Sequence, residues 1–258
     1  MFDAHGHLSD PRIADFVIEL CASLRDDGLE HVVLGGVNPS EWDRQELLKN
    51  QFPEFVTHVI GIHPWTVRDT NDAGLEVMFA ALKSRGRAAK ALGEMGLDFY
   101  SDNSTAQKQR QAHWCKRQLQ LAEELKKPVV LHVVKGHDIM QAMLRDFKGP
   151  AVMVHGFRGH AQVAKFYMDR GYLLSLGMRS FAKLAPEDFA WLPKNGFAIE
   201  SDAPIYHDGS LYLNEVRREW IAALNGAGEF LAKVWKIDAG EVWHLARTNM
   251  NRFLNGLD

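Results

Sequence analysis

The sequence has little cysteine, no long apolar run and no strong excess of charge of either sign. Cys21 and Cys115 are its only cysteines, and they form no Cys-x-x-Cys motif. This scarcity excludes a disulfide framework and suits a reducing compartment. No apolar run reaches the roughly 20 residues that span a bilayer, and the polar residues that begin at Asp3 do not fit a secretory signal peptide. We therefore expect a cytoplasmic protein without a membrane partner.

The net charge is −3 at pH 7. A protein that grips nucleic acid by broad electrostatic attraction needs many lysine and arginine side chains facing the phosphates, and this composition argues against such a surface. If the substrate is nucleic acid, the attraction must be local. Bound divalent cations are one way to supply it.

Short apolar segments of strand character alternate with segments of helical periodicity. At 258 residues and 46% apolar composition, the chain suits either one large α/β barrel or two small domains. The segments of strand character are eight: residues 2–5, 31–35, 56–62, 89–93, 129–133, 151–155, 172–176 and 197–201. Several are apolar without alternation, as parallel strands covered on both faces are. We predict an α/β fold, a single (β/α)8 TIM-like barrel domain over residues 1–258, with a doubly wound open sheet as the alternative.

Helices are expected between these strands, including residues 13–26, 75–84, 106–126 and 139–147. In the longest of them, Cys115, Leu119, Ala122 and Leu125 recur every three or four residues and predict one buried stripe. Pro128 follows and ends that helix before the next strand. Residues 214–253 read as two further helices that close the barrel.

In such a barrel, reactive groups gather at the carboxyl ends of the strands, so polar residues after apolar runs are the candidates for function. Alone, each of these residues is more typical of a solvated strand end. Together they form a mixed nitrogen and oxygen donor set suited to Zn²⁺, Mn²⁺ or Mg²⁺. The candidate metal ligands are His5, His7, Glu94, His132, His155 and Asp202.

Six ligands exceed what one tetrahedral ion requires, so we expect two divalent metal ions with Glu94 as their bridge. Two ions roughly 3.5 to 4 Å apart can activate a water and stabilise both the attacking and leaving oxygens of a phosphodiester. Asp202 is the candidate general base. Catalytic roles are thus expected for Asp202 and Glu94.

These residues lie in segments that resemble the TatD family of metal-dependent deoxyribonucleases. The segments follow the family's order and span nearly the whole chain: Phe2-Asp3-Ala4-His5-Gly6-His7-Leu8, Gly61-Ile62-His63-Pro64, Gly93-Glu94-Met95-Gly96-Leu97-Asp98-Phe99-Tyr100, His155-Gly156-Phe157-Arg158-Gly159 and Glu200-Ser201-Asp202-Ala203-Pro204. The resemblance implies the barrel, the two-metal site and hydrolysis of DNA, often from a 3′ end, with RNA as a further candidate substrate. It matches the same six ligands, and their retained identities argue against a degenerate copy.

The resemblance also implies substrate contacts. It matches His63 to a histidine that contacts the substrate phosphate, the alternative being a loop histidine held by Pro64. Candidate phosphate partners are Lys135, Arg158 and Arg179, each otherwise a solvated surface charge, and Trp65 and Phe99 are candidates for stacking on a base. Asp98 is expected either to orient its neighbours around the metals or to cap a helix.

Two segments depart from the family pattern. After His132 the family has a small residue and then an arginine, whereas this chain has Val133-Val134-Lys135-Gly136-His137, so Lys135 or His137 is expected to take over that phosphate contact. Residues 205–216, after Pro204, also differ from the pattern of relatives. The substrate is therefore less firmly predicted than the metal site.

Two other functions remain open at this point. Related barrels use a similar His-x-His rim to hydrolyse lactones, amides or small phosphoesters, although many of them bridge their ions with a lysine where this chain has Glu94. The other alternative is a subunit that acts mainly through partner proteins in a multi-protein defence assembly. The sequence does not identify such partners.

Overall fold

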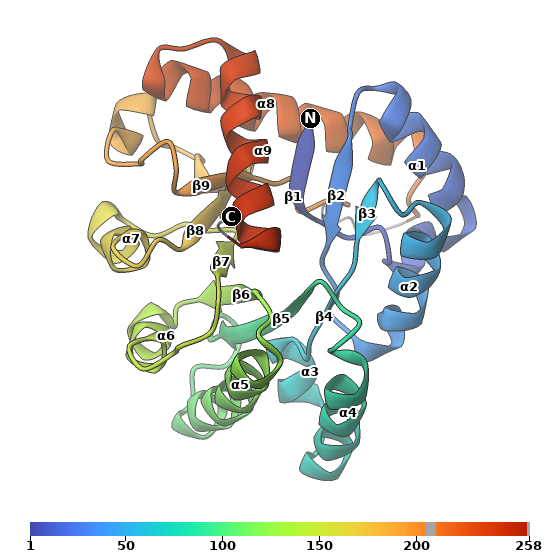
Figure 1. The fold of residues 1–258 in the computed structure, drawn as a ribbon, viewed down its shortest axis with the longest axis vertical. Helices are drawn as coiled ribbons and strands as arrows, with labels where there is room; N and C mark the ends of the chain where they lie inside the picture. Colours follow the sequence, from blue (N-terminus) through green and yellow to red (C-terminus); the bar gives the residue numbers. More distant parts are fainter. Residues whose placement is uncertain (205–209, 257–258) are drawn as a thin grey trace.

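The computed structural model describes residues 1–204 and 210–256, and every paired strand in these ranges runs parallel to its neighbour. The strands follow one another around the fold in chain order (Figure 1). They are β1 (Phe2–Gly6), β2 (His31–Leu34), β3 (Val56–Thr57), β4 (Val59–Ile60), β5 (Ala91–Asp98), β6 (Val129–Val134), β7 (Val152–His155), β8 (Leu173–Leu176) and β9 (Phe197–Ile199).

The helices that connect these strands lie outside them in Figure 1. The α-helices are α1 (Val17–Asp26), α2 (Trp42–Gln51), α3 (Pro64–Asp69), α4 (Asp72–Arg85), α5 (Thr105–Leu125), α6 (His137–Leu144), α7 (Ala161–Met168), α8 (Leu213–Trp235) and α9 (Ala239–Asn255). Four short 3₁₀ helices accompany them, namely η1 (Pro11–Phe16), η2 (Pro39–Glu41), η3 (Met178–Ser180) and η4 (Pro186–Phe189). The expected pair of C-terminal helices is confirmed by α8 and α9. The segment expected as one helix over residues 13–26 instead divides between η1 and α1.

The longest connecting helix, α5, forms where the apolar periodicity predicts it. The Ser104 side chain caps its first turn by accepting a hydrogen bond from the Gln107 amide, and Lys126 ends it in a left-handed conformation. Cys115, Leu119 and Ala122 are buried along one stripe, as predicted. This stripe packs in the apolar layer between the strands and the surrounding helices.

Two strands differ from the prediction more than the others do. The segment expected as one strand over residues 56–62 is interrupted at His58, so β3 pairs with β2 while β4 pairs with β5. The strand expected to end at Gly93 begins at Ala91 and runs to Asp98. Glu94 therefore lies inside β5 rather than after it. The polar residues of this strand face the site. In the sequence they therefore resemble residues that follow a strand.

The strands close into a barrel, although their backbone hydrogen bonds form two groups, β1 to β3 and β4 to β9. The segment after β9 is bonded to the last part of β1 and the residue that follows it: the His5 carbonyl accepts from the Asp202 amide at 3.0 Å, and the His7 amide donates to the Ala203 carbonyl at 2.7 Å. One interior cluster takes residues from all eight positions around the ring: Phe2, Ala4, Val33, Val59, Ala91, Val130, Met153, Leu173 and Ala198. The fold is thus the predicted (β/α)8 barrel with a filled interior.

Helix α9 closes the amino-terminal end of this barrel, on the side of β1 and β9 (Figure 1). Its Met250, Phe253 and Leu254 join the interior cluster. The Asn249 side chain donates to the carbonyl oxygen of Phe197, the first residue of β9. The carboxyl ends of the strands are therefore the end left for chemistry. Among residues 1–204 and 210–256, no helix combines the length and apolar character that spanning a bilayer demands.

Candidate metal centre

The six predicted ligands converge at the carboxyl ends of the strands. They come from β1 and the residue after it, from β5, β6 and β7, and from the segment that follows β9. Among the described residues, three overlapping groups of potential donor atoms lie close enough to share an ion: His5, His7 and Glu94; His5, His155 and Asp202; and His63, Glu94 and His132. Residues separated by as many as 197 positions in the sequence thus meet at one site.

The two carboxylate oxygens of buried Glu94 face different histidines. Oε1 lies 3.4 Å from Nε2 of His5. Oε2 lies 2.9 Å from Nε2 of His155 and 3.8 Å from Nδ1 of His132. The backbone amide of Gly36 also donates to Oε1, at 3.1 Å, and fixes the orientation of the carboxylate. This arrangement places Glu94 between two sets of donors.

His7 and Asp202 form the outer edge of the set. Nε2 of His7 lies 3.2 Å from Oδ1 of Asp202, and the Arg179 guanidinium approaches Oδ2 at 3.4 Å. Asp202 has a φ of 54°, a left-handed backbone conformation that aspartate adopts more readily than most side chains do. This conformation lets a residue three positions past β9 reach the end of β1.

The donor set fits divalent cations. Ligands bonded at about 2.0–2.1 Å lie about 2.8–3.4 Å apart around a tetrahedral or octahedral ion, and the separations here of 2.9 to 3.8 Å overlap that range. Both ring nitrogens of the buried His5 lack a hydrogen-bond partner within the described residues. Buried polar atoms without partners are rare in proteins, so a cation is the natural occupant.

Two carboxylates behind the ligands orient their imidazoles. Oδ2 of Asp98 lies 3.2 Å from Nε2 of His132, so a neutral His132 presents its unprotonated Nδ1 to the centre. Oε2 of the buried Glu200 lies 3.8 Å from Nδ1 of His155, whose Nε2 points at Glu94. Carboxylate partners of this kind fix the tautomer and the orientation of metal-binding histidines. Asp98 is not a helix cap.

His63 is buried beside the same centre, with Nε2 3.8 Å from Oε2 of Glu94. Its Nδ1 accepts a hydrogen bond from the Trp65 amide at 3.1 Å. Burial and the neighbouring His132 lower the pKa of His63 well below its ordinary value, so the ring is neutral. A neutral imidazole that accepts at Nδ1 carries its proton at Nε2. His63 is therefore a hydrogen-bond donor toward the centre.

The charges at the centre follow from burial and proximity. Burial alone would raise the pKa of Glu94, but His5 and His155 lower it well below the usual range, so Glu94 is ionised. Burial would also raise the pKa of Asp202, yet the hydrogen bond from His7 and its charge lower it. The pKa of His7 is correspondingly raised to about 9, because Asp202 and Glu94 outweigh its burial. Carboxylates clustered in this way favour the binding of cations.

Gly35 makes room for the histidines of β1. A Cβ atom at this position would lie 2.4 Å from Nε2 of His5 and 2.8 Å from Cε1 of His7. Gly6, which lies between the two histidines in the sequence, packs instead against Trp220, where a Cβ would lie 2.4 Å from the indole. The glycine that shapes the site thus follows β2 rather than β1.

Comparison with known proteins assigns the family. The model of the family described as TatD related DNase matches residues 2–255. The chain belongs to this family. It is 33% identical over 207 residues to the protein named uncharacterized metal-dependent hydrolase YjjV of Escherichia coli, covering 78% of each chain. It is 28% identical over 217 residues to the 3′-5′ ssDNA/RNA exonuclease TatD of Dickeya dadantii, covering 79% of this chain and 78% of the relative.

Solved structures of the TatD family share the fold. The crystal structure of YjjV from E. coli superposes with a TM-score of 0.81 at 23% identity over 99% of this chain and 98% of the other. The family assignment confirms the resemblance seen in the motifs. As a TatD-related protein, the chain is a metal-dependent hydrolase of ester bonds.

The predicted substrate contacts have mixed outcomes. Trp65 lies beside the centre, with its ring centroid 4.9 Å from that of His63 and its indole N–H donating to Asp98. Lys135, Arg158 and Arg179 are exposed on the loops that follow β6, β7 and β8. Residues 205–209 of the divergent segment lie outside the described residues, so their part in the site stays a prediction.

One substrate prediction is wrong. Phe99 is only 2% exposed and packs in the core, so it cannot stack on a base. The ring of His137, the alternative to Lys135 for the phosphate contact, packs against Phe157, and its Nδ1 lies 2.9 Å from the Tyr167 hydroxyl. A phosphate contact by either Lys135 or His137 stays a prediction.

Two acidic residues around the site, Asp3 and Glu200, lie in the quoted motifs, but no role is predicted for them from the sequence. Asp3 is fully buried and accepts hydrogen bonds from the Ser201 amide and hydroxyl and from the Trp220 indole. The available signal was an acidic residue within or directly after an apolar strand, because Asp3 lies in β1 and Glu200 follows β9.

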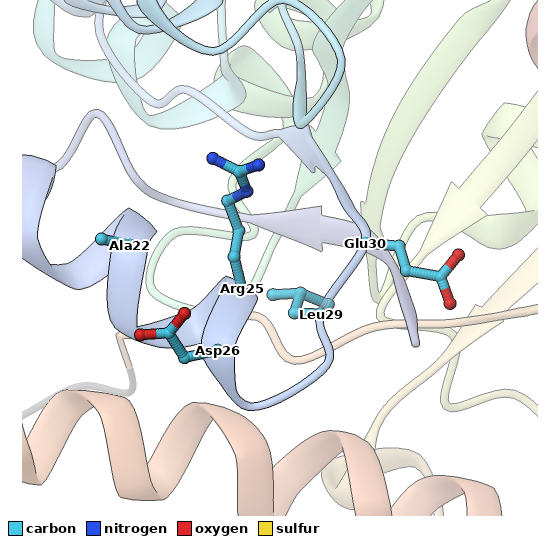
Figure 2. A pocket seen from close by; sticks show the side chains of 5 residues that line it. All are labelled: Ala22, Arg25, Asp26, Leu29 and Glu30. Carbon is cyan, nitrogen blue, oxygen red and sulfur yellow. The ribbon is translucent and has the colours of Figure 1, made fainter.

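A surface hollow at the other end of the barrel is separate from this centre. It is lined by Ala22, Arg25, Asp26, Leu29 and Glu30 (Figure 2). These residues lie at the end of α1 and just before β2, whereas the candidate ligands lie at the carboxyl ends of the strands. The side chain of Glu30 pairs with the amino terminus of the chain. Nothing in this hollow resembles the donor set of the metal centre.

Proposed function

We propose that this TatD-related hydrolase cleaves phosphodiester bonds in single-stranded DNA from the 3′ end, and in RNA as well, at a centre of two divalent cations. The observation that carries the proposal is that the two carboxylate oxygens of Glu94 face different histidines. Oε1 faces His5, whereas Oε2 faces His132 and His155. The relative from D. dadantii is named as a 3′-5′ ssDNA/RNA exonuclease, which supports the substrate and polarity.

In this proposal His5, His7, Glu94 and Asp202 would hold one ion, and Glu94, His132 and His155 would hold the other. When bound, two divalent cations supply Lewis acidity, because they make water more acidic and offset the charge of the phosphate. The metal itself is Mg²⁺, Mn²⁺ or Zn²⁺. The donors are nitrogen and carboxylate oxygen, which all three accept.

The side chains around the ions have separate tasks. Asp202 takes a proton from the attacking water at one carboxylate oxygen, while Arg179, 3.4 Å from Oδ2, holds the carboxylate in place. His63 donates Nε2–H to an oxygen of the scissile phosphate, since its Nδ1 is already an acceptor. Lys135 and Arg158 contact further phosphates, and Trp65 packs against the substrate.

A small-molecule amidohydrolase is the weaker candidate. Glu94 and not a lysine stands between the two donor sets, so the bridge is a carboxylate. A role exercised mainly through protein partners has no specific support in the described residues. Cys21 and Cys115 are both buried free thiols, which agrees with the cytoplasmic location that belongs to the same proposal.

The test is cleavage of single-stranded DNA and RNA labelled at the 3′ or the 5′ end, with Mg²⁺, Mn²⁺, Zn²⁺ or EDTA. We expect metal-dependent release of the 3′ label as the first product, and a rate about 10² to 10⁴ times lower for Asp202→Asn, which removes the base but keeps the size of the side chain. Early release of the 5′ label would overturn the polarity. Intact substrate under every condition would overturn the proposed activity.

A further inference from the structure

Most aromatic side chains in this barrel are buried, but two exposed ones stand at the metal centre. Of the phenylalanine, tryptophan and tyrosine side chains within residues 1–204 and 210–256, only Trp65, Tyr100 and Tyr212 are largely exposed, at 36%, 74% and 63%. An exposed aromatic ring does not contribute the stabilisation of the fold that burial of its apolar surface would give. Trp65, through its indole N–H, and Tyr100, through its backbone amide, both donate a hydrogen bond to the Asp98 carboxylate.

Asp98 connects these rings to the candidate ligands. Its Oδ1 accepts from the Tyr100 amide at 2.8 Å, and its Oδ2 accepts from the Trp65 indole at 2.7 Å. The same Oδ2 lies 3.2 Å from Nε2 of His132. A single side chain thus fixes a predicted metal ligand and positions the backbone of Tyr100 and the ring of Trp65. The Trp65 ring and the Tyr100 backbone therefore have defined places relative to the candidate ligand His132.

Lys135 completes this group of side chains. Strands β5 and β6 are in register at Asp98 and Val134, and the Phe99 amide donates to the Val134 carbonyl. Tyr100 and Lys135 consequently lie side by side just past the ends of β5 and β6, and the Lys135 ammonium is 4.7 Å from the centroid of the Tyr100 ring. Lys135 has a φ of 55°, a left-handed conformation that lysine rarely adopts. A flat ring and a cation are thus presented together to solvent.

We propose that Tyr100 and Lys135 form a nucleotide subsite beside the metal centre, in which a base stacks on the exposed Tyr100 ring and the Lys135 ammonium contacts the adjoining phosphate. This inference rests on the proposed nuclease function and adds the recognition of an unpaired base. Base stacking on aromatic side chains tolerates any sequence, and it requires a base that is not stacked within a duplex. The subsite thus selects single strands without selecting sequence.

The test compares oligodeoxynucleotides that carry an abasic site at one of the last three positions with the intact oligomer. Cleavage rate and binding, measured by fluorescence anisotropy with Ca²⁺ in place of the active metal, are followed for wild type, Tyr100→Ala and Tyr100→Phe. Removing the stacked base should lower the cleavage rate and the binding affinity of the wild type by about 5-fold to 150-fold. On the intact oligomer, Tyr100→Ala should lose rate and affinity by the same factor, and the abasic site should lower neither any further in this variant. Tyr100→Phe should keep most of the difference between intact and abasic oligomers, because its ring still stacks.

Val77→Ala, an exposed apolar truncation on α4 away from the centre, is the matched control and should behave as wild type. If wild type cleaves DNA but Tyr100→Ala slows intact and abasic oligomers equally, or slows neither, the subsite is overturned and the nuclease function stands. If wild type binds with base-dependent loss in Tyr100→Ala but never cleaves, the subsite stands and the nuclease function fails. Absence of both binding and cleavage overturns both.

Discussion

Nδ1 of His155 faces Oε2 of Glu200 across 3.8 Å, and neither atom has a hydrogen-bond partner within the described residues. The other ring nitrogen of His155 lies 2.9 Å from Glu94. Because a buried imidazole with one nitrogen toward a carboxylate presents the other as a ligand, Glu200 is a positioning residue for His155.

We predict that Glu200→Ala weakens metal binding by about 10- to 100-fold, because the His155 ring loses the group that holds its orientation. Glu200→Gln, which keeps the size and one oxygen, should weaken it less. The measurement is titration calorimetry with Mn²⁺ on protein freed of metal. Unchanged affinity in Glu200→Ala would contradict the positioning role. Circular dichroism on each variant separates this effect from loss of fold.

Gly35→Ala should remove metal from the site while leaving the barrel folded. The added Cβ would lie 2.4 Å from Nε2 of His5, so one of the two β1 imidazoles must move. We expect at least a tenfold loss of metal affinity, on the order of the loss seen when orienting groups are removed. Gly86→Ala is the control, because its Cβ would also be crowded, at 2.9 Å from the Leu82 carbonyl, but at the end of α4. Equal metal affinity in both variants would refute this account of Gly35.

Asp3→Ala should destabilise the barrel at the junction of β1 and β9. Asp3 accepts from the Ser201 amide and hydroxyl and from the Trp220 indole, and its removal leaves these buried donors unpaired. At about 1–3 kcal/mol for each buried donor left without a partner, the free energy of unfolding should fall by at least about 3 kcal/mol. Urea denaturation measures it. A loss below about 1 kcal/mol would show that the closure depends on other contacts.

His137 should make the stability of the protein depend on pH. Burial lowers its pKa to about 4 from the ordinary 6.5. Because the folded pKa is the lower one, the unfolded chain binds more protons between these values, and stability falls as the pH drops from 6.5 toward 4. His137→Phe should lessen that fall by an amount on the order of 2 kcal/mol. Denaturant unfolding at several pH values measures it, and an unchanged slope would contradict the prediction. Replacing the exposed His160 by phenylalanine leaves His137 in place and is the control.

The sequence alone was sufficient to predict the barrel and to single out the residues that meet at its rim. Polar residues after apolar runs mark the carboxyl ends of parallel strands, and a barrel brings those ends together whatever their separation in the chain. For this reason His5, Glu94, His132, His155 and Asp202 could be found without coordinates. Their roles as ligands remain the proposal that the measurements test.

Features that depend on strand register and side-chain direction could not be predicted in this way. Phe99 and Tyr100 are adjacent aromatic residues, and only the path of the chain after β5 decides that the first is buried and the second exposed. The direction in which Asp3 and Glu200 point is set by the closure of β9 onto β1, which joins residues about 200 positions apart in the sequence. The break at His58 likewise follows from pairing with two different neighbours.

The most direct test of the central claim is the number of metal ions bound by each chain. Elemental analysis after reconstitution with Mn²⁺ or Zn²⁺ and removal of free ions should give two ions for wild type and no more than one for Glu94→Ala, because Glu94 stands between both donor sets. Val77→Ala should retain both ions. One ion or none in wild type, or two retained by Glu94→Ala, would contradict the bridged two-metal centre.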